Sequence, residues 1–213
     1  MSTPRALLLD IGGVLLTSAH ERMAQFDAPR EFTDVRGLLG PRPDPAWDDV
    51  LAGHGTERAY WAARAAEYGA ITGGPGTVPA LMDALYTGTE PFRPEVIALM
   101  DDAHAAGLVV AALTNDLAAF HGDADLTRHP VLGRFDTVID GSVTGVLKPD
   151  SRAYAHALAV LGLPADEVVF LDDVPGNCAG SRAAGIVTVE VDLRDPGAAV
   201  ARARDLLTLR AAA

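Results

Sequence analysis

The sequence predicts an α/β fold, a doubly wound parallel sheet with a small helical cap inserted after the first strand. Short, fully apolar runs recur along the chain, and helical stretches that end at glycine lie between them. Strands that are apolar on both faces and alternate with helices are typical of a parallel sheet covered on both sides. Residues 17–89 have helical stretches but no convincing strand. We therefore assign residues 1–16 and 90–213 to the core domain and 17–89 to the cap.

The first strand is predicted over Arg5–Asp10, because Ala6–Leu9 is continuously apolar and Gly12-Gly13 then interrupts the pattern. Two further runs have the same character and also stop at polar residues, and two weaker ones lie near them. These four predicted strands are Leu108–Leu113, Thr137–Ile139, Val168–Leu171 and Ile186–Val189.

Helices are predicted between these strands. Three core helices are each followed by glycine, the residue that a left-handed C-terminal cap prefers: Pro94–Ala106, Ser151–Leu161 and Pro175–Ala184. The cap helices are predicted over Ala19–Phe26, Pro45–Leu51, Thr56–Tyr68 and Val78–Tyr86, separated by a Pro-rich break at 41–45 and a Gly-rich turn at 73–76. The cap aromatics are expected to fill its own small core.

Composition excludes several classes of protein. The net charge is −12, with 17 Lys+Arg against 29 Asp+Glu, which argues against nucleic acid or an anionic membrane surface as partner. No apolar run approaches the ~18–20 residues that span a bilayer. The single cysteine, Cys178, excludes an internal disulfide. We expect a cytoplasmic protein, monomeric or homodimeric.

Lys148 is the only lysine, beside sixteen arginines. An ammonium and a guanidinium are not interchangeable at a tight site. A lysine retained in a chain that otherwise uses arginine is therefore a candidate functional residue.

Polar residues follow three of the apolar strands. Asp10 ends the first, Thr114-Asn115-Asp116 follows the second, and Asp172-Asp173 follows the fourth. Function collects at the carboxyl ends of strands in an open parallel sheet. Clustered carboxylates suit Mg²⁺, a carboxylate can attack phosphorus, and a lysine and a hydroxyl can neutralise or hold the transferring oxygens.

These motifs resemble the haloacid dehalogenase-like hydrolase superfamily. The four motifs are Leu9–Val14, Ala112–Asn115, Lys148 with Pro149-Asp150, and Phe170–Asp173 with Asn177 beyond. The sequence is most similar to the subgroup with a small helical cap, which includes the amino-terminal phosphatase domain of soluble epoxide hydrolase and bacterial sugar-phosphate phosphatases.

The resemblance implies roles for individual residues. Asp10 is the expected nucleophile and a Mg²⁺ ligand, together with the Gly12 carbonyl and Asp173. Asp172 and Asn177 are expected to support this metal site. Thr114, the Asn115 backbone and Lys148 are expected to bind the phosphoryl group. The implied activity is hydrolysis of a small phosphorylated metabolite through an aspartyl-phosphate.

One departure concerns Gly12, where the phosphatases of this superfamily usually carry a second Asp that protonates the leaving group and activates water. General acid–base help is worth roughly 10²–10⁴ in rate. A phosphatase without this Asp could act on a substrate with a good leaving group, or could use another acid such as Asp116 or His20.

Three other interpretations stay open. A metal-independent 2-haloacid dehalogenase also lacks that Asp, but Asp172 and Asp173 would then repel each other beside the nucleophile without a cation. A carbon–phosphorus hydrolase typically needs a cap lysine, and residues 17–89 contain none. A catalytically impaired binding protein is the last interpretation.

Overall fold

The computed structural model describes residues 3–25, 32, 43–122 and 125–209. A parallel sheet forms the centre of the molecule, with strand order β3-β2-β1-β4-β5. This confirms the predicted α/β class. The strands are β1 (Ala6–Leu9), β2 (Val109–Thr114), β3 (Thr137–Asp140), β4 (Val168–Asp172) and β5 (Val187–Glu190).

The central strand β1 lies between β2 and β4 and is buried along its whole length. Its side chains alternate between two cores. Leu7 and Leu9 join the core beneath α6 (Pro94–Ala105) and α11 (Pro196–Leu206), whereas Leu8 packs in the core beneath α9 (Ser151–Leu161). Burial on both faces is the reason why the strand is apolar at every position.

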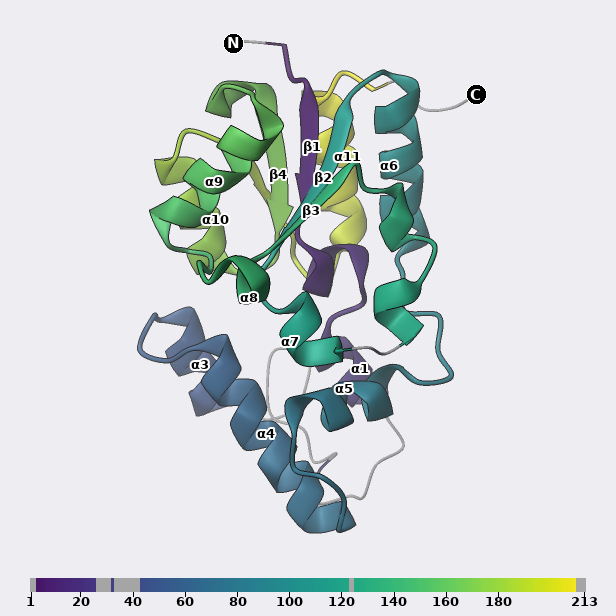
Figure 1. The fold of residues 1–213 in the computed structure, drawn as a ribbon, viewed down its shortest axis with the longest axis vertical. Helices are drawn as coiled ribbons and strands as arrows, with labels where there is room; N and C mark the ends of the chain where they lie inside the picture. The colour runs from purple at the N-terminus through teal and green to yellow at the C-terminus, as the bar shows by residue number, and fades with distance from the viewer. Residues whose placement is uncertain (1–2, 26–31, 33–42, 123–124, 210–213) are drawn as a thin grey trace.

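The remaining core helices lie around this sheet (Figure 1). The short helices α7 and α8 follow β2 and β3, and α10 contacts β4 and β5. Gly107, Gly162 and Gly185 have positive φ after α6, α9 and α10, as predicted from their positions. The bounds are α7 (Leu117–His121), α8 (Gly141–Thr144) and α10 (Pro175–Ala183), with single 3₁₀ turns at Asp125–Arg128, Leu132–Arg134 and Ala165–Glu167.

Among the described residues, four α-helices lie between Leu16 and Phe92 in the chain, and we call them the cap helices. They lie beyond the carboxyl ends of the strands (Figure 1). Their described residues share a core that includes Trp47, Tyr60, Trp61 and Tyr86, which confirms the interpretation of these aromatics. The bounds are α1 (Ala19–Gln25), α3 (Pro45–Leu51), α4 (Glu57–Thr72) and α5 (Val78–Tyr86). The division into a core domain and a cap domain stays a prediction.

Helix α4 runs four residues beyond its predicted end at Tyr68. Gly69 does not stop the helix, because glycine is needed there for close packing. A Cβ at Gly69 would lie 2.6 Å from the Cα of Gly76. The helix ends instead at Gly73, whose φ of 72° suits glycine. The predicted end of the first cap helix at Phe26, and Pro41-Arg42 of the Pro-rich break, lie outside the described residues.

Within the described residues, every helix is too short or too polar to cross a membrane.

Candidate active site

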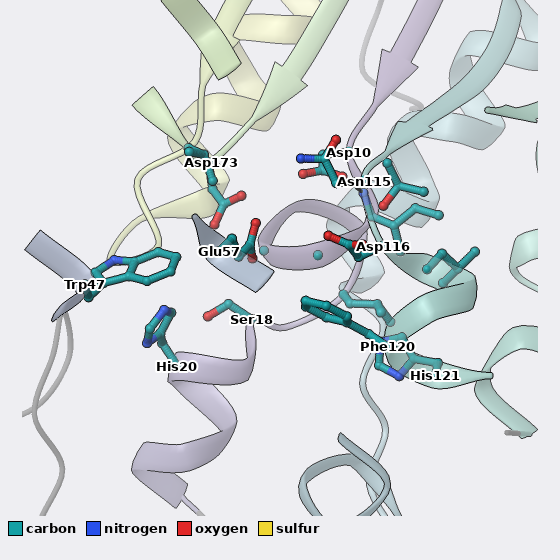
Figure 2. A pocket seen from close by; sticks show the side chains of 17 residues that line it. Asp10, Ser18, His20, Trp47, Glu57, Asn115, Asp116, Phe120, His121 and Asp173 are labelled. Atoms are coloured by element: carbon teal, nitrogen blue, oxygen red, sulfur yellow. Dashed lines mark hydrogen bonds between the residues drawn. The ribbon is translucent and has the colours of Figure 1, made fainter. Parts of the chain in front are cut away.

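The predicted site residues meet where the strands end. Asp10 directly follows β1, Thr114 is the last residue of β2, and Asp172 is the last residue of β4. Because β2 and β4 flank β1 in register, their ends open onto one edge of the sheet. A cavity of about 80 Å³ begins there, and we call it the catalytic cavity (Figure 2). Its lining includes Asp10, Gly12, Thr114, Asn115 and Asp173.

Lys148 is buried between two carboxylates. Its Nζ lies 3.0 Å from Oδ2 of Asp10 and donates to Oδ2 of Asp172 at 2.6 Å. The side chain of Asn115 holds the lysine backbone on both sides: its Oδ1 accepts from the Lys148 N–H at 2.7 Å, and its Nδ2 donates to the Lys148 carbonyl at 3.1 Å. Contacts to both its backbone and its ammonium group therefore fix Lys148 beside the predicted nucleophile.

Asp172 binds the Lys148 ammonium, and its own oxygens are bound by neighbouring groups. Its Oδ1 accepts from the Val174 N–H at 2.9 Å and from Asn177 Nδ2 at 3.1 Å. Burial alone would lower the pKa of Lys148, but the carboxylates of Asp10 and Asp172 outweigh burial and raise it. The ammonium form is thus maintained. Asn177 and Asp172 thus contact each other beside Lys148, and their supporting role at a metal site stays a prediction.

Asp173 is the carboxylate without a compensating partner. Among the described residues it has no hydrogen bond and no ion pair. Oxygens of Asp10, Asp172 and Asp173 all lie within 4.8 Å of one another. Burial, followed by the charges of Asp172 and Asp10, raises the pKa of Asp173 well above its usual value. Three carboxylates face one ammonium here, and an oxygen-rich site with excess negative charge fits a hard divalent cation.

Asp10 is oriented by its own turn. Its Oδ1 accepts from the Ile11 N–H at 2.7 Å, which leaves Oδ2 toward Lys148. Burial raises the pKa of Asp10, and the neighbouring ammonium opposes that rise. A cation in the carboxylate cluster would favour the ionised, nucleophilic form further.

Thr114 is almost fully buried at the end of β2, at 5% exposure, and lines the cavity. No hydrogen bond to its hydroxyl occurs among the described residues. The hydroxyl is thus available to an oxygen of a ligand, as the phosphoryl-binding prediction requires.

Gly12 and Gly13 differ in whether the backbone and the surrounding space require glycine. Gly13 has a φ of 71°, and a Cβ there would lie 2.2 Å from Oδ2 of Asp173, so both backbone and space require glycine. Gly12 has ordinary extended angles, and a Cβ there would meet nothing within 4 Å. Gly12 therefore has room for a Cβ, because the position opens into the cavity.

The cap side of the cavity contributes residues of a different kind. His20 and Trp47 are each 5% exposed and line the cavity, with ring centroids 4.2 Å apart. Within the part of the chain that the structure describes, neither nitrogen of His20 nor the indole N–H of Trp47 has a hydrogen-bond partner. The His20 ring is enclosed by Trp47 of α3 and by two aromatic residues of α4, Tyr60 and Trp61. Burial lowers its pKa to about 4, so the ring is neutral near pH 7.

Two further acidic residues line the cavity, and the sequence analysis named only one of them, Asp116. Glu57, the first residue of α4, points into the cavity (Figure 2). In the sequence it is indistinguishable from the acids that commonly start helices. Asp116, an alternative acid in the sequence interpretation, also lines the cavity, but Arg58 Nε pairs with its Oδ1 at 2.5 Å.

Cys178 packs in α10, as expected. It is fully buried, and its Sγ donates to the Asp172 carbonyl at 3.3 Å. Burial raises the pKa of its thiol to about 12, which excludes a thiolate nucleophile at neutral pH.

Similarity to known proteins agrees with this arrangement. The haloacid dehalogenase-like hydrolase family model matches residues 4–185. The chain is 28% identical to the sesquiterpene phosphatase astK of Aspergillus oryzae, over 87% of this chain and 89% of that protein. It is 33% identical to the phosphoserine phosphatase of Thermus thermophilus, over 48% of this chain and 41% of the relative.

The chain spans 18% of the length of a mouse relative, named as an acyl-CoA dehydrogenase family member, that matches 88% of the chain at 26% identity. Among solved structures, the L-2-haloacid dehalogenase of Xanthobacter autotrophicus superposes with a TM-score of 0.56 and 21% identity, over 98% of this chain and 84% of that one. This structural likeness supports the fold. The strand-end motifs, the parallel sheet and the family match together establish that the chain belongs to the haloacid dehalogenase-like hydrolases.

Proposed function

We propose that the protein is a Mg²⁺-dependent phosphatase that hydrolyses a small phosphorylated metabolite through an aspartyl-phosphate on Asp10. The observation that carries this proposal is the uncompensated carboxylate of Asp173 beside Asp10 and Asp172. A metal-independent dehalogenase would leave this partly buried carboxylate without a cation beside two others, which is costly. The relatives named as phosphatases support the same choice.

The chain supplies most of the required chemistry through its own residues. The Asp10 carboxylate attacks phosphorus, and the Thr114 hydroxyl binds a phosphoryl oxygen. Lys148 neutralises charge on the nucleophile and the phosphoryl group, while Asp172 holds the ammonium in place. Asp10, the Gly12 carbonyl and Asp173 would hold Mg²⁺, whose positive charge stabilises the phosphoryl oxygens in the transition state.

A panel of phosphomonoesters, assayed with Mg²⁺ and with a chelator, tests the proposal. Phosphate release is expected with Mg²⁺, and its loss with chelator should be restored by added Mg²⁺. Asp10→Asn is expected to reduce turnover to background, because it removes the nucleophile. Asp205→Asn on α11 is the matched control, since this exposed carboxylate lies on a helix that does not line the cavity.

Halide release from 2-haloacids that resists the chelator would establish the dehalogenase instead. Turnover of neither class, with phosphometabolite binding intact, would establish a binding protein.

A further inference from the structure

The catalytic cavity adjoins a second, larger space of about 350 Å³, which we call the outer cleft. The outer cleft lies between the α3–α4 segment and the core segments around Lys148 and Val174. The catalytic cavity is small, so a phosphoryl group bound at Asp10 and Thr114 leaves the rest of a substrate to occupy the outer cleft. The scissile ester oxygen then lies near the junction of the two spaces.

Four residues line both spaces and so define this junction: Glu57, Asn115, Asp116 and Val174. Val174 is apolar. Both ends of the Asn115 amide bind the backbone of Lys148. Asp116 is paired with Arg58. Glu57 is the junction residue with a titratable group and no cationic partner among the described residues.

Glu57 is held in place without being neutralised. Thr56 caps α4 by accepting from the Ala59 N–H at 3.2 Å, and the Trp61 indole donates to Oε1 of Glu57 at 3.3 Å. The hydrogen bonds among described residues leave Oε2 free. Glu57 does not belong to the cluster of three carboxylates that fits a metal ion. Its carboxyl is therefore fixed on one oxygen and open to a ligand on the other.

We propose that Glu57 is the general acid and base of the reaction and takes the role of the carboxylate absent at Gly12. The inference rests on the proposed phosphatase function. As Asp10 bonds to phosphorus and the ester P–O bond breaks, protonated Glu57 gives its proton to the leaving oxygen. The resulting Glu57 carboxylate then takes a proton from the water that attacks phosphorus. The bond between phosphorus and Asp10 breaks, and phosphate leaves with Glu57 protonated again.

The electrostatic surroundings suit this cycle. The charged groups around Glu57 are the carboxylates of Asp116, Asp172 and Asp173 and the cations of Arg58 and Lys148. Burial is the largest influence and raises the pKa of Glu57 to about 7, against the hydrogen bond from Trp61. A catalytic acid that must also act as a base works best near the working pH.

The two other candidate acids are less suited. His20 is neutral at pH 7, because burial lowers its pKa to about 4, and it has no acidic proton to give. Burial raises the pKa of Asp116, against the opposing influence of Arg58. Its Oδ1 is nevertheless paired with the Arg58 guanidinium at 2.5 Å, whereas Glu57 has no cationic partner among the described residues.

The test compares leaving groups. In Glu57→Gln, kcat/KM for an alkyl phosphate is expected to fall about 10²–10⁴-fold. For p-nitrophenyl phosphate it should fall less than about tenfold, because that leaving group needs little protonation. The value of kcat/KM reports steps up to departure of the leaving group, so a slower second step does not obscure the comparison. Glu95→Gln, which removes a first-turn acid of α6, is the matched control and should leave both substrates unchanged.

A second variant supplies the rescue. Gly12→Asp in the Glu57→Gln background should restore kcat/KM for the alkyl phosphate at least tenfold, because the space at Gly12 is open. In the wild-type background the same change should help much less, since an acid is already present.

An equal fall for both substrates, no fall for either, or no rescue by Gly12→Asp would overturn the role of Glu57 while leaving the phosphatase proposal intact. A wild-type protein that hydrolyses neither phosphate in the presence of Mg²⁺ would overturn the proposed function itself, and the two failures are thereby distinguished.

Discussion

The core side and the cap side of the catalytic cavity differ in how their polar groups are satisfied. On the core side, Lys148 and Asp172 have defined partners for the ammonium and for both carboxylate oxygens. On the cap side, His20 and Trp47 retain nitrogens without partners among the described residues, and Glu57 retains one oxygen that no described residue binds. The core thus fixes Lys148 and Asp172 by internal contacts, whereas the cap presents polar groups that are open to a ligand.

On the core side, Lys148, Asp10 and Asp172 form a closed network of ion pairs, and substitution of Lys148 breaks it most directly. Lys148→Met leaves Asp10 and Asp172 buried without their ammonium, and loss of one partner from a buried pair costs about 3–5 kcal/mol. We expect the free energy of unfolding in urea to fall by that amount and turnover to disappear. Arg152→Met, which removes a cation exposed on α9, should leave the free energy of unfolding close to that of the wild type. Equal stability of the Lys148 variant and the wild type would contradict a closed network.

The adjacent glycines allow the two sides of the cavity to be compared by substitution. Gly13 faces the carboxylate of Asp173, and Gly12 faces the open cavity. Gly13→Ala is expected to lower the free energy of unfolding by about 1–3 kcal/mol for its positive φ, with further loss from displacement of Asp173. Gly12→Ala should be neutral or stabilising by up to about 1 kcal/mol, because it restricts the unfolded chain. Thermal unfolding of the two variants checks the prediction, and similar losses in both would show that the loop rather than Asp173 sets the requirement.

The cap side is tested by the dependence of stability on pH. Since the pKa of Glu57 is raised to about 7, the folded protein keeps a proton between pH 4.5 and 7 that the unfolded chain has released. The free energy of unfolding should therefore decrease as the pH rises through this window. Glu57→Gln removes this contribution, which is at most about 1.4 kcal/mol per pH unit. Urea unfolding of metal-free protein at pH 5 and pH 7.5 measures it, and identical slopes in both proteins would mean that Glu57 is solvated.

Much of the fold follows from local patterns. Each predicted strand overlaps a strand of the sheet. The pattern is clearest for the three inner strands β1, β2 and β4, which are buried and apolar up to the polar residues at their ends. The seven strand-end and loop residues of the predicted site come together for the same topological reason: the carboxyl ends of parallel strands share one edge. Their roles in catalysis stay predictions.

The amino-acid sequence is sufficient to predict the sheet, the cluster at its edge and the importance of Lys148, because periodicity and strand-end residues report on single elements of structure. Three features emerge only from the folded chain: Glu57 enters the cavity, His20 is buried, and Gly12 has room for a side chain where Gly13 has none. These outcomes depend on how the cap helices pack against the strand ends. A helix-starting glutamate and two adjacent glycines have the same local signature wherever that packing places them.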